Sequence, residues 1–295
     1  MHCIDSNRNT RRGRFTRLMM LVQSLLFVMI GLFLLPASAS AAPLVYVVNL
    51  NQQFGTLDLA TGAFHPIGAT APEPLAGLVW APDGSLYTIF SLSGSLVKIN
   101  PSTGSMKVVG LTGLGSNVFS FAGVEGKLYV TDFNNNIYSV DRHTGFATLM
   151  RATGIPPDPS VPFTFNADGT FNLCDESFYG VNGHLYATFD SFDFNPNADP
   201  NFLVVNPKVH PKLYRIDPST GEATPIGHTD MQLVSSVAVD GKFYGFRGVL
   251  TGFSGGFPLA YSELVSIDLD SGKISYVRPL DPDLGPVFGA APVRP

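Results

Sequence analysis

One short phrase recurs five times between residues 57 and 272, and it constrains the fold more than any other feature of the chain. Each copy has an aliphatic residue, Asp or Asn, two variable residues, Thr or Ser, and Gly. Side chains of Asp and Thr can bind turn backbone and Gly accepts a positive φ, so the phrase predicts a tight turn. The first three copies end 42 and 41 residues apart. The five copies end at Gly62, Gly104, Gly145, Gly221 and Gly272.

A second repeated feature, an apolar residue followed by Tyr, marks a strand within each interval. Four of these pairs follow a turn such as Asp83-Gly84 or Asn182-Gly183, which favours a β-hairpin because both turn residues can adopt positive φ. Alternating segments such as residues 96–99 are typical of strands, and nothing after residue 42 has a helical period. Each interval therefore predicts four antiparallel strands. The pairs are Val45-Tyr46, Leu86-Tyr87, Leu128-Tyr129, Leu185-Tyr186 and Phe243-Tyr244.

A period of about 40–45 residues with four strands is typical of the blades of a β-propeller. The sequence therefore predicts an all-β fold with five four-stranded antiparallel blades. The repeats begin at a second strand, residues 44–48, and end at a first strand, residues 287–291. If these two strands join in one blade, the ring closes and neither leaves a free edge. A sixth, degenerate blade within residues 151–182 is the alternative.

These residues resemble the repeats of secreted bacterial β-propellers in which Leu-Tyr is followed by Ile-Asp-Pro-x-Thr-Gly. The quinoprotein-dehydrogenase-like and YVTN-like superfamilies contain such repeats, and the resemblance covers residues 44–291. It implies the propeller architecture and no specific enzyme family, since the shared residues belong to strands and turns. Quinone-binding members use repeated Trp residues, whereas this chain has only Trp80. We therefore expect no cofactor.

Residues 1–39 have the features of a secretory signal peptide. Five Arg precede an almost wholly apolar stretch at residues 18–35, and a run of Ala and Ser follows Pro36. The protein is therefore predicted to be secreted or periplasmic, with residues 40–295 as a single propeller domain and no membrane span after cleavage. An uncleaved anchor is the alternative, since about 18 apolar residues are just enough to cross a membrane.

The charge of the exported part disfavours polyanionic partners. Removing residues 1–39 leaves 13 Lys and Arg against 22 Asp and Glu, a net charge of −9. This argues against nucleic acid and anionic membrane surfaces. We expect a monomer that binds a protein, a peptide or a carbohydrate. Cys174 is the one cysteine after the leader, and we interpret it as a small buried residue and not as a nucleophile.

Three long segments interrupt the repeats, at residues 151–176, 190–211 and 247–262. In a propeller, the links between blades and those between second and third strands share one face, so all three should lie together. Long loops on a rigid scaffold commonly carry binding sites. We therefore predict a non-catalytic binding module whose aromatic residues in these loops contact the ligand. The alternative is that the same rings form a small core that packs the long loops against the domain. These aromatic residues are Phe192, Phe194, Phe202, Phe253 and Tyr261.

The alternative is an enzyme of the lyase, lactonase or glycoside hydrolase type, with an acidic site at the mouth of the same face. Glycoside hydrolases use two carboxylates, and Glu176 with Asp190 offers such a pair. The sequence has no nucleophile elbow and no metal-spaced His pattern, and the expected first strands are mostly apolar. The candidate catalytic residues are Glu176, Asp190, His210 and Arg247.

Side chains with oxygen atoms occur at every second position in residues 193–199, a spacing that calcium loops use. The match to an EF-hand fails, because Ala198 replaces the Gly of the sharp turn and Val204 replaces the closing Glu. A solvated loop is therefore the favoured interpretation, and calcium is the alternative. The calcium ligands would be Asp193, Asn195, Asn197 and Asp199.

Overall fold

The chain divides into two units, Met1–Ala42 and Pro43–Pro295. The structure, a computed structural model, describes residues 43–294 except 133, 153–170, 195–203, 208–211, 229–232 and 255–256. Within the strands it gives the backbone, but not the side chains, of residues 151–152, 171–176, 189–194, 204–207, 212, 228, 250–254 and 257–260.

The second unit contains five antiparallel sheets, named here blades I to V, each given from its innermost strand outward. Blade I has β21 (Val287–Pro292), β1 (Leu44–Asn49), β2 (Phe54–Asp58) and β3 (Phe64–Pro66). Blade II has β4 (Leu75–Trp80), β5 (Leu86–Phe90), β6 (Ser95–Ile99) and β7 (Met106–Leu111). Blade III has β8 (Val118–Val124), β9 (Lys127–Asp132), β10 (Asn136–Val140) and β11 (Ala147–Ala152).

Blade IV has β12 (Phe171–Val181), β13 (His184–Phe194), β15 (Lys212–Ile216) and β16 (Ala223–His228), with the short β14 (Val204–Pro207) paired to β13. Blade V has β17 (Ser235–Val239), β18 (Lys242–Ser254), β19 (Phe257–Ile267) and β20 (Ile274–Pro279). Two single-turn 3-10 helices, η1 (Gly115–Asn117) and η2 (Pro282–Leu284), precede the inner strands of blades III and I.

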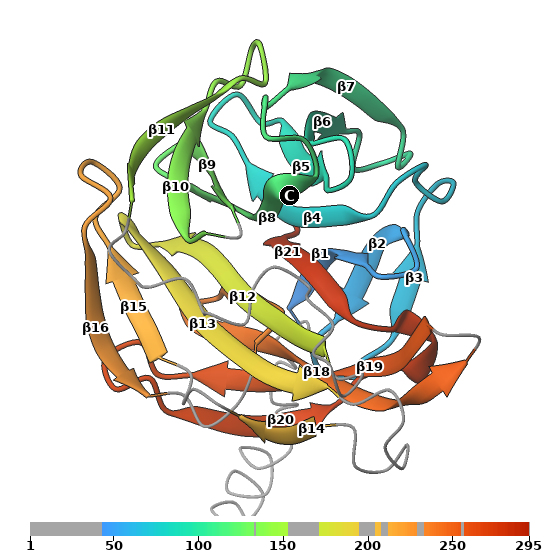
Figure 1. Cartoon of the computed structure of the whole chain (residues 1–295). Helices are drawn as coiled ribbons and strands as arrows, with labels where there is room; N and C mark the ends of the chain where they lie inside the picture. The colour runs from blue at the N-terminus through green and yellow to red at the C-terminus, as the bar shows by residue number, and fades with distance from the viewer. Residues whose placement is uncertain are drawn as a thin grey trace, which may run out of the picture. The chain divides into compact units, whose positions relative to one another are not determined.

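The innermost strands of the five blades surround the axis of a ring (Figure 1). β21 contacts β4, β4 contacts β8, β8 contacts β12, β12 contacts β17, and β17 contacts β21 again. β21 pairs with β1 in antiparallel register, with Tyr46 opposite Ala291 and Val47 opposite Ala290. The predicted five-bladed β-propeller, closed by the first and last strands in one blade, is therefore confirmed.

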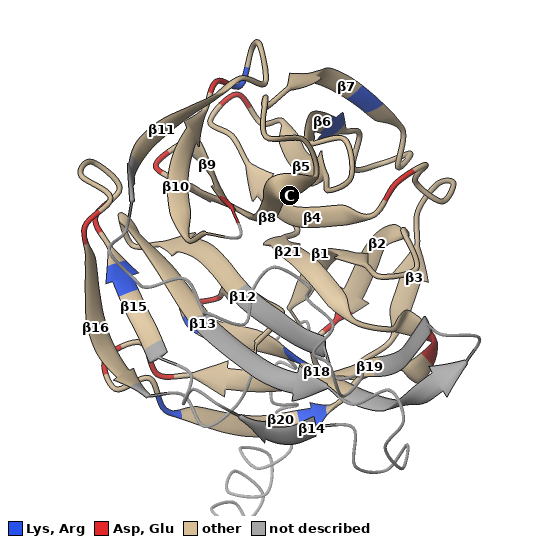
Figure 2. Cartoon of the chain, viewed as in Figure 1, with Lys and Arg blue, Asp and Glu red and all other residues tan. Residues whose placement is uncertain are grey.

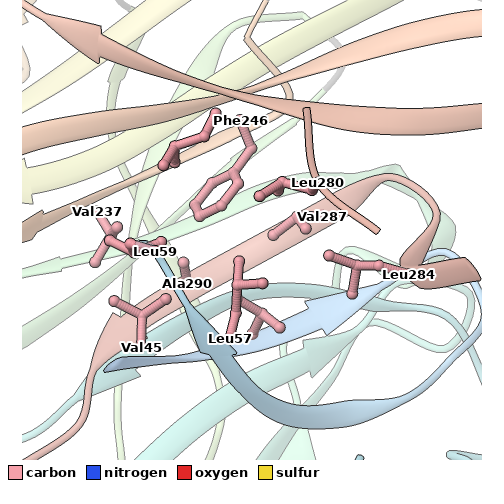
Figure 3. Packing of buried hydrophobic residues seen from close by; sticks show 11 residues of the cluster. Val45, Leu57, Leu59, Val237, Phe246, Leu280, Leu284, Val287 and Ala290 are labelled. Carbon is pink, nitrogen blue, oxygen red and sulfur yellow. The ribbon is translucent and has the colours of Figure 1, made fainter. Parts of the chain in front are cut away.

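The core lies in layers between neighbouring blades, because each sheet is apolar on both of its faces. Every residue of β5 is buried, and β6 exposes only Lys98. Figure 3 shows the layer between blades V and I, in which Phe246 and Val237 belong to the same buried cluster as Val45 and Leu57. Phe246 is fully buried. Burial of such a side chain stabilises the fold by about 1.5–3 kcal/mol.

The repeated turn forms as the sequence predicts. In blade I the Oδ1 of Asp58 accepts hydrogen bonds from the N–H groups of Ala60 and Thr61 at 2.7 and 3.0 Å, and Gly62 has a φ of 79°. The Gly of this turn has a second role between blades II and III. A Cβ on Gly145 would lie 2.6 Å from the carbonyl oxygen of Gly110, in the outer strand of the preceding blade. The turn therefore needs Gly both for its own φ and for the close contact between blades.

The three long segments are not loops throughout, which corrects the sequence-based prediction. Residues 247–254 and 257–262 belong to a β-hairpin, in which β18 and β19 stay paired up to Ser254 and Phe257. Residues 171–176 belong to β12 and residues 190–194 to β13, and these two segments pair with each other. The backbone hydrogen bonds of these segments are therefore satisfied by neighbouring strands, which local sequence patterns do not reveal.

Strand lengths differ sharply between the blades. β12, β13, β18 and β19 have 11 to 13 residues, whereas the first and second strands of blades I to III have 5 to 7. The additional residues lie at the N-terminal end of β12 and at the C-terminal end of β13. Both ends lie on the side where one blade is linked to the next, so the two strands extend on that side. We name this side the projecting side. The opposite side, which carries turns such as Asn182-Gly183 and Asp240-Gly241, is the tight-turn side.

Candidate functional site

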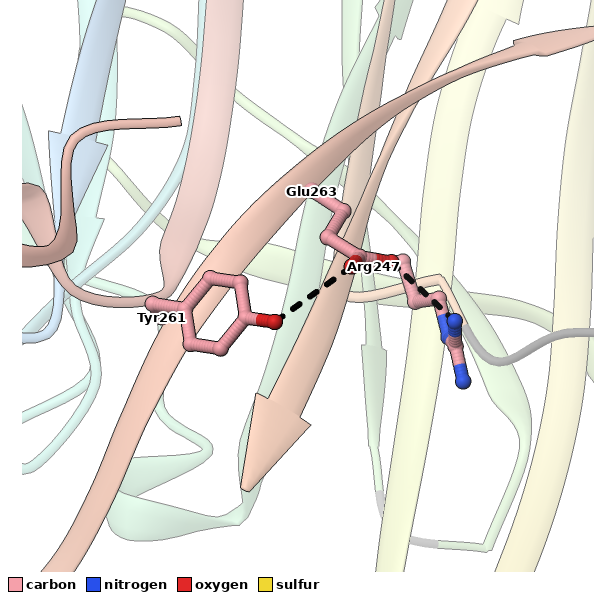
Figure 4. Close-up of polar contacts among 3 residues, drawn as sticks. All are labelled: Arg247, Tyr261 and Glu263. Atoms are coloured by element: carbon pink, nitrogen blue, oxygen red, sulfur yellow. Dashed lines mark hydrogen bonds and ion pairs between the residues drawn. The ribbon is translucent and has the colours of Figure 1, made fainter. Parts of the chain in front are cut away.

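An ion pair joins the two strands at the base of the projecting hairpin of blade V. Arg247 in β18 lies directly opposite Glu263 in β19. The Nη1 of Arg247 donates to the Oε2 of Glu263 at 3.0 Å, and the Tyr261 hydroxyl donates to the Oε1 at 3.4 Å (Figure 4). The Arg247 side chain is 39% exposed and that of Glu263 is 15% exposed. The guanidinium is therefore the charged group of this cluster that solvent and ligands can reach.

The electrostatics of the cluster keep Tyr261 protonated. Burial raises the pKa of Tyr261, and the negative charge of Glu263 and its hydrogen bond to the phenol raise it further. Both oxygens of Glu263 accept hydrogen bonds, so this carboxylate acts as a fixed acceptor that positions Arg247 and Tyr261. The planar guanidinium can in turn bind a carboxylate or a carbonyl group of a ligand.

Two sequence candidates meet in this cluster, although the sequence assigns them to different functions. Arg247 belongs to the alternative catalytic set, and Tyr261 belongs to the ligand-binding set. Glu263, which joins them, is not among the sequence candidates. Its contact with Arg247, 16 residues earlier, depends on the register of a long hairpin, so no local motif identifies it.

The other sequence candidates have side chains that the structure does not describe. The backbone register of blade IV pairs Asp190 with Asp175 and Glu176 with Phe189. The backbone positions of Phe192, Asp193 and Phe194 lie in β13, and that of Phe253 lies in β18. The candidates wholly outside the described residues are Asn195, Asn197, Asp199, Phe202 and His210.

A cavity of about 200 Å³ lies inside the ring, between the innermost strands. Its lining residues include the C-terminal residues of β4 and β21, Trp80 and Pro292, so the cavity extends toward the tight-turn side. Each innermost strand is the edge of its sheet, so one row of its backbone N–H and C=O groups has no strand partner. Glycines bring two of these strands close together: a Cβ on Gly289 would lie 2.4 Å from the carbonyl carbon of Gly77.

The wall of this cavity is polar as well as apolar, because the unpaired backbone edges of the innermost strands belong to it. β4, β8, β17 and β21 contain no charged residue, and in Figure 2 the coloured charges lie on turns and on strands outside the innermost layer. Two serine hydroxyls on the wall have partners of their own, whereas the buried hydroxyl of Tyr179, another lining residue, has no hydrogen-bond partner among the described residues. The Ser235 hydroxyl donates to the carbonyl oxygen of Val287 at 2.6 Å, and the Oγ atoms of Ser236 and Ser177 lie 3.0 Å apart.

Trp80, Pro292 and Arg294 line the end of the cavity on the tight-turn side. The guanidinium carbon of Arg294 lies 5.0 Å from the centroid of the Trp80 ring, within the range of a cation–π contact. Arg294 is the one charged residue among the described residues that line the cavity. The sequence gives no reason to select it, because it lies beyond the last strand.

Within the described parts of residues 43–294, no three His, Cys, Asp or Glu residues are grouped closely enough to hold a metal ion. The same parts of the chain contain no helix that is long and apolar enough to cross a membrane.

No family model matches the sequence, and no curated protein matches it. A chain in the crystal structure of the nidogen/laminin complex matches with a TM-score of 0.50 and 11% identity, over 86% of this chain and 98% of that one. Virginiamycin B lyase from Staphylococcus aureus matches with a TM-score of 0.38 and 16% identity, over 72% of this chain and 64% of that one. The first likeness concerns the fold alone, and with the ring of five sheets it identifies the chain as a β-propeller.

Proposed function

We propose that the chain is an exported, non-catalytic binding module, whose ligand is a protein, a peptide or a carbohydrate held on the projecting side. The observation that carries this proposal is the length of β12, β13, β18 and β19, which have 11 to 13 residues. These strands belong to two adjacent blades, because β12 contacts β17. The additional backbone of both blades therefore extends on one side of the ring.

Paired strands make a better binding surface than free loops. Their backbone is already ordered by inter-strand hydrogen bonds, so less conformational entropy is lost when a ligand binds. In blade V the ion pair of Arg247 with Glu263 holds the base of the hairpin, and the guanidinium remains 39% exposed. This arrangement supports ligand contact by Arg247 and by its neighbour Tyr261. The roles of Phe192, Phe194, Phe202 and Phe253 remain predictions.

A binding role is preferred to an acidic active site on the same side. Hydrolysis of a glycoside needs two carboxylates with different tasks. Among the side chains that the structure describes in this cluster, the carboxylate is that of Glu263, and Arg247 and Tyr261 both bind it. Glu176, Asp190 and His210 remain the candidates for an enzyme.

Export is part of the proposal. It is supported by the Arg-rich start, the apolar stretch at residues 18–35 and the run of Ala and Ser that follows. Mass spectrometry of the protein released from an exporting bacterial host measures the N-terminus directly. A chain that begins close to residue 40 supports export with cleavage, and a membrane-bound chain that keeps residues 1–39 contradicts it.

Shortening the projecting hairpin of blade V tests the binding role. Replacing residues 249–261 with Asn-Gly would leave Gly248 opposite Ser262, as they are now. Asn182 and Gly183 already form such a turn in blade IV. A thermal-shift screen against sugars, lactones and peptides, with and without EDTA, would compare the variant with the unaltered protein. We expect that a ligand which stabilises the unaltered protein no longer stabilises the variant, whose own melting temperature shifts by only a few degrees.

The matched control changes a turn on the tight-turn side. Asp240→Asn keeps the hairpin turn that Asp240 and Gly241 form at positive φ, so this variant should bind like the unaltered protein. A ligand that stabilises the hairpin variant equally well contradicts the proposal. Turnover of a lactone or a glycoside by the purified protein contradicts the non-catalytic role.

A further inference from the structure

We propose a second binding site at the centre of the ring, where the cavity takes a small monocarboxylate with an uncharged body. Arg294, at the tight-turn end of the cavity, would bind the carboxylate group. This site lies apart from the projecting side and does not depend on the function proposed there. The size of the cavity, the chemistry of its wall and the placement of Arg294 on Trp80 carry the proposal.

The volume restricts the ligand to the size of a single ring. An apolar cavity of about 150 Å³ can hold benzene, whereas pockets for drug-sized ligands begin at about 300 Å³. The central cavity, at about 200 Å³, therefore accommodates one six-membered ring with a carboxylate. A fused bicyclic body exceeds this space.

The wall favours an uncharged body. Apart from Arg294, every described residue that lines the cavity is uncharged, Phe121, Phe178, Phe243 and Phe288 among them. Two wall serines use their hydroxyls within the protein, since Ser235 donates to the carbonyl oxygen of Val287 and the Oγ of Ser236 lies 3.0 Å from that of Ser177. A charged group placed midway along the cavity would lose its hydration without gaining an opposite charge. The charge of a suitable ligand must therefore lie at one end.

Arg294 provides the opposite charge at the tight-turn end. Its guanidinium lies over the face of Trp80, and this stacking leaves the N–H groups at the edge of the planar group free for a carboxylate. Within the described residues, no ion pair involves Arg294. Trp80 is itself held in place, because its Nε1 donates to the carbonyl oxygen of Pro292 at 2.7 Å. Trp80 is therefore held in position at the tight-turn end of the cavity, and the exposed Arg294 side chain lies against it.

The single tryptophan makes the site measurable, because Trp80 is the only one in the chain. Benzoate, titrated into the purified protein at constant ionic strength, should change the tryptophan emission saturably with a Kd of about 1 mM or lower. Benzamide has the same shape without the charge, and it should bind at least about tenfold more weakly. 2-Naphthoate keeps the carboxylate but exceeds the cavity, and it should also bind at least about tenfold more weakly.

Substitutions test whether benzoate binds at Arg294. Arg294→Gln should weaken benzoate binding at least about tenfold, measured by calorimetry so that the readout does not depend on the stack on Trp80. Arg142→Gln is the matched control, since it removes a cation from a turn on the same side, outside the cavity lining. It should leave the affinity unchanged. The protein with the shortened blade V hairpin should also bind benzoate normally, so a failure of this proposal is distinct from a failure of the proposed function.

Several results would overturn the proposal. No saturable change in fluorescence or heat would show that the cavity takes no such ligand. Equal affinity for benzoate and benzamide would exclude the carboxylate contact, and equal affinity for 2-naphthoate would place the binding on the surface. Equal affinity of the Arg294→Gln variant and the unaltered protein would exclude Arg294 as the anchor.

Discussion

The indole Nε1 of Trp80 donates a 2.7 Å hydrogen bond to the carbonyl oxygen of Pro292, 212 residues later in the chain. Trp80 ends the inner strand of blade II, and Pro292 ends the inner strand of blade I. The last strand of the chain is therefore fixed twice, by its pairing with β1 and by this contact with the next blade. Closure of the ring thus depends on residues from both ends of the domain.

Removal of the last strand should unfold the ring. Deleting residues 287–295 takes away β21 and exposes both the edge of β1 and the buried cluster that includes Phe246. We expect the truncated chain to lose its cooperative thermal transition, measured by circular dichroism. Deleting only Pro295 is the control and should leave the transition in place. A cooperative transition close to that of the full chain after the longer deletion would show that β21 is dispensable.

A methyl group at the centre of the ring should be costly. A Cβ on Gly289 would lie 2.4–2.8 Å from the backbone atoms of Gly77, which cannot move without displacing an inner strand. Gly289→Ala should therefore lower the free energy of unfolding by about 3 kcal/mol in urea titrations. A Cβ on Gly241 would have no atom within 4 Å, so the only penalty there is the φ of +70°. Gly241→Ala should therefore lower the free energy of unfolding by about 1 kcal/mol. Equal costs for the two variants would argue against the close approach of β21 and β4.

Three carboxylates of the repeated turn should make the protein sensitive to acid. Hydrogen bonds from the turn hold the pKa of Asp141, Asp217 and Asp268 below the usual value. The main-chain N–H of His143 is the largest cause for Asp141, and the Ser219 hydroxyl is the largest for Asp217. A lowered pKa in the folded state means that these groups stabilise the fold above the unfolded pKa of about 3.9. That stabilisation is lost as the pH falls below this value.

The repeated turn of blade II shows which substitution tests this prediction. It has Asn100 at the same position, and the Oδ1 of Asn100 accepts from the N–H groups of Ser102 and Thr103. Changing the three aspartates to Asn should leave the melting temperature at pH 7 nearly unchanged and make it fall less steeply below about pH 4. Melting temperatures measured across this range test the prediction. An equally steep fall in the triple variant would assign the acid sensitivity to other groups.

The ion pair at the base of the projecting hairpin should contribute modestly to stability. Arg247 is 39% exposed, so solvent screens its attraction to Glu263. A double-mutant cycle with Arg247→Met and Glu263→Gln, measured by urea unfolding, should give a coupling energy of about 1 kcal/mol. Arg247→Met alone should be more harmful than both changes together, because it leaves the Glu263 carboxylate, 15% exposed, without its partner. A coupling energy of zero would mean that the ion pair of Arg247 and Glu263 does not stabilise the hairpin.

The blades could be predicted from the sequence because their turns are determined locally. The Asp and Thr of each repeated phrase bind backbone only two or three residues away, as Asp58 does with Ala60 and Thr61. Ring closure could be predicted as well, since the first repeat lacks an inner strand and the last residues supply one.

The projecting strands and the two clusters could not be predicted in the same way. Gly248, Gly252 and Gly255 favour turns and loops, yet β18 pairs with β19 through most of this segment. Tertiary pairing overrides local preference there. Glu263 meets Arg247 only once the register of that hairpin is set, and the Arg294 side chain lies over Trp80 only once the ring is closed. Such contacts depend on the three-dimensional arrangement and have no signature in a short stretch of sequence.

Closure of the ring is tested most directly by a disulfide between its two ends. The N–H of Val293 donates to the carbonyl oxygen of Leu44 at 3.2 Å, and antiparallel neighbours have the Cα separation that a disulfide needs. In a chain with Cys3 and Cys174 changed to Ser, Leu44→Cys with Val293→Cys should form an intramolecular disulfide on oxidation, detected by mass spectrometry, and the melting temperature should rise. Free thiols, or disulfides only between molecules, would contradict the closed ring.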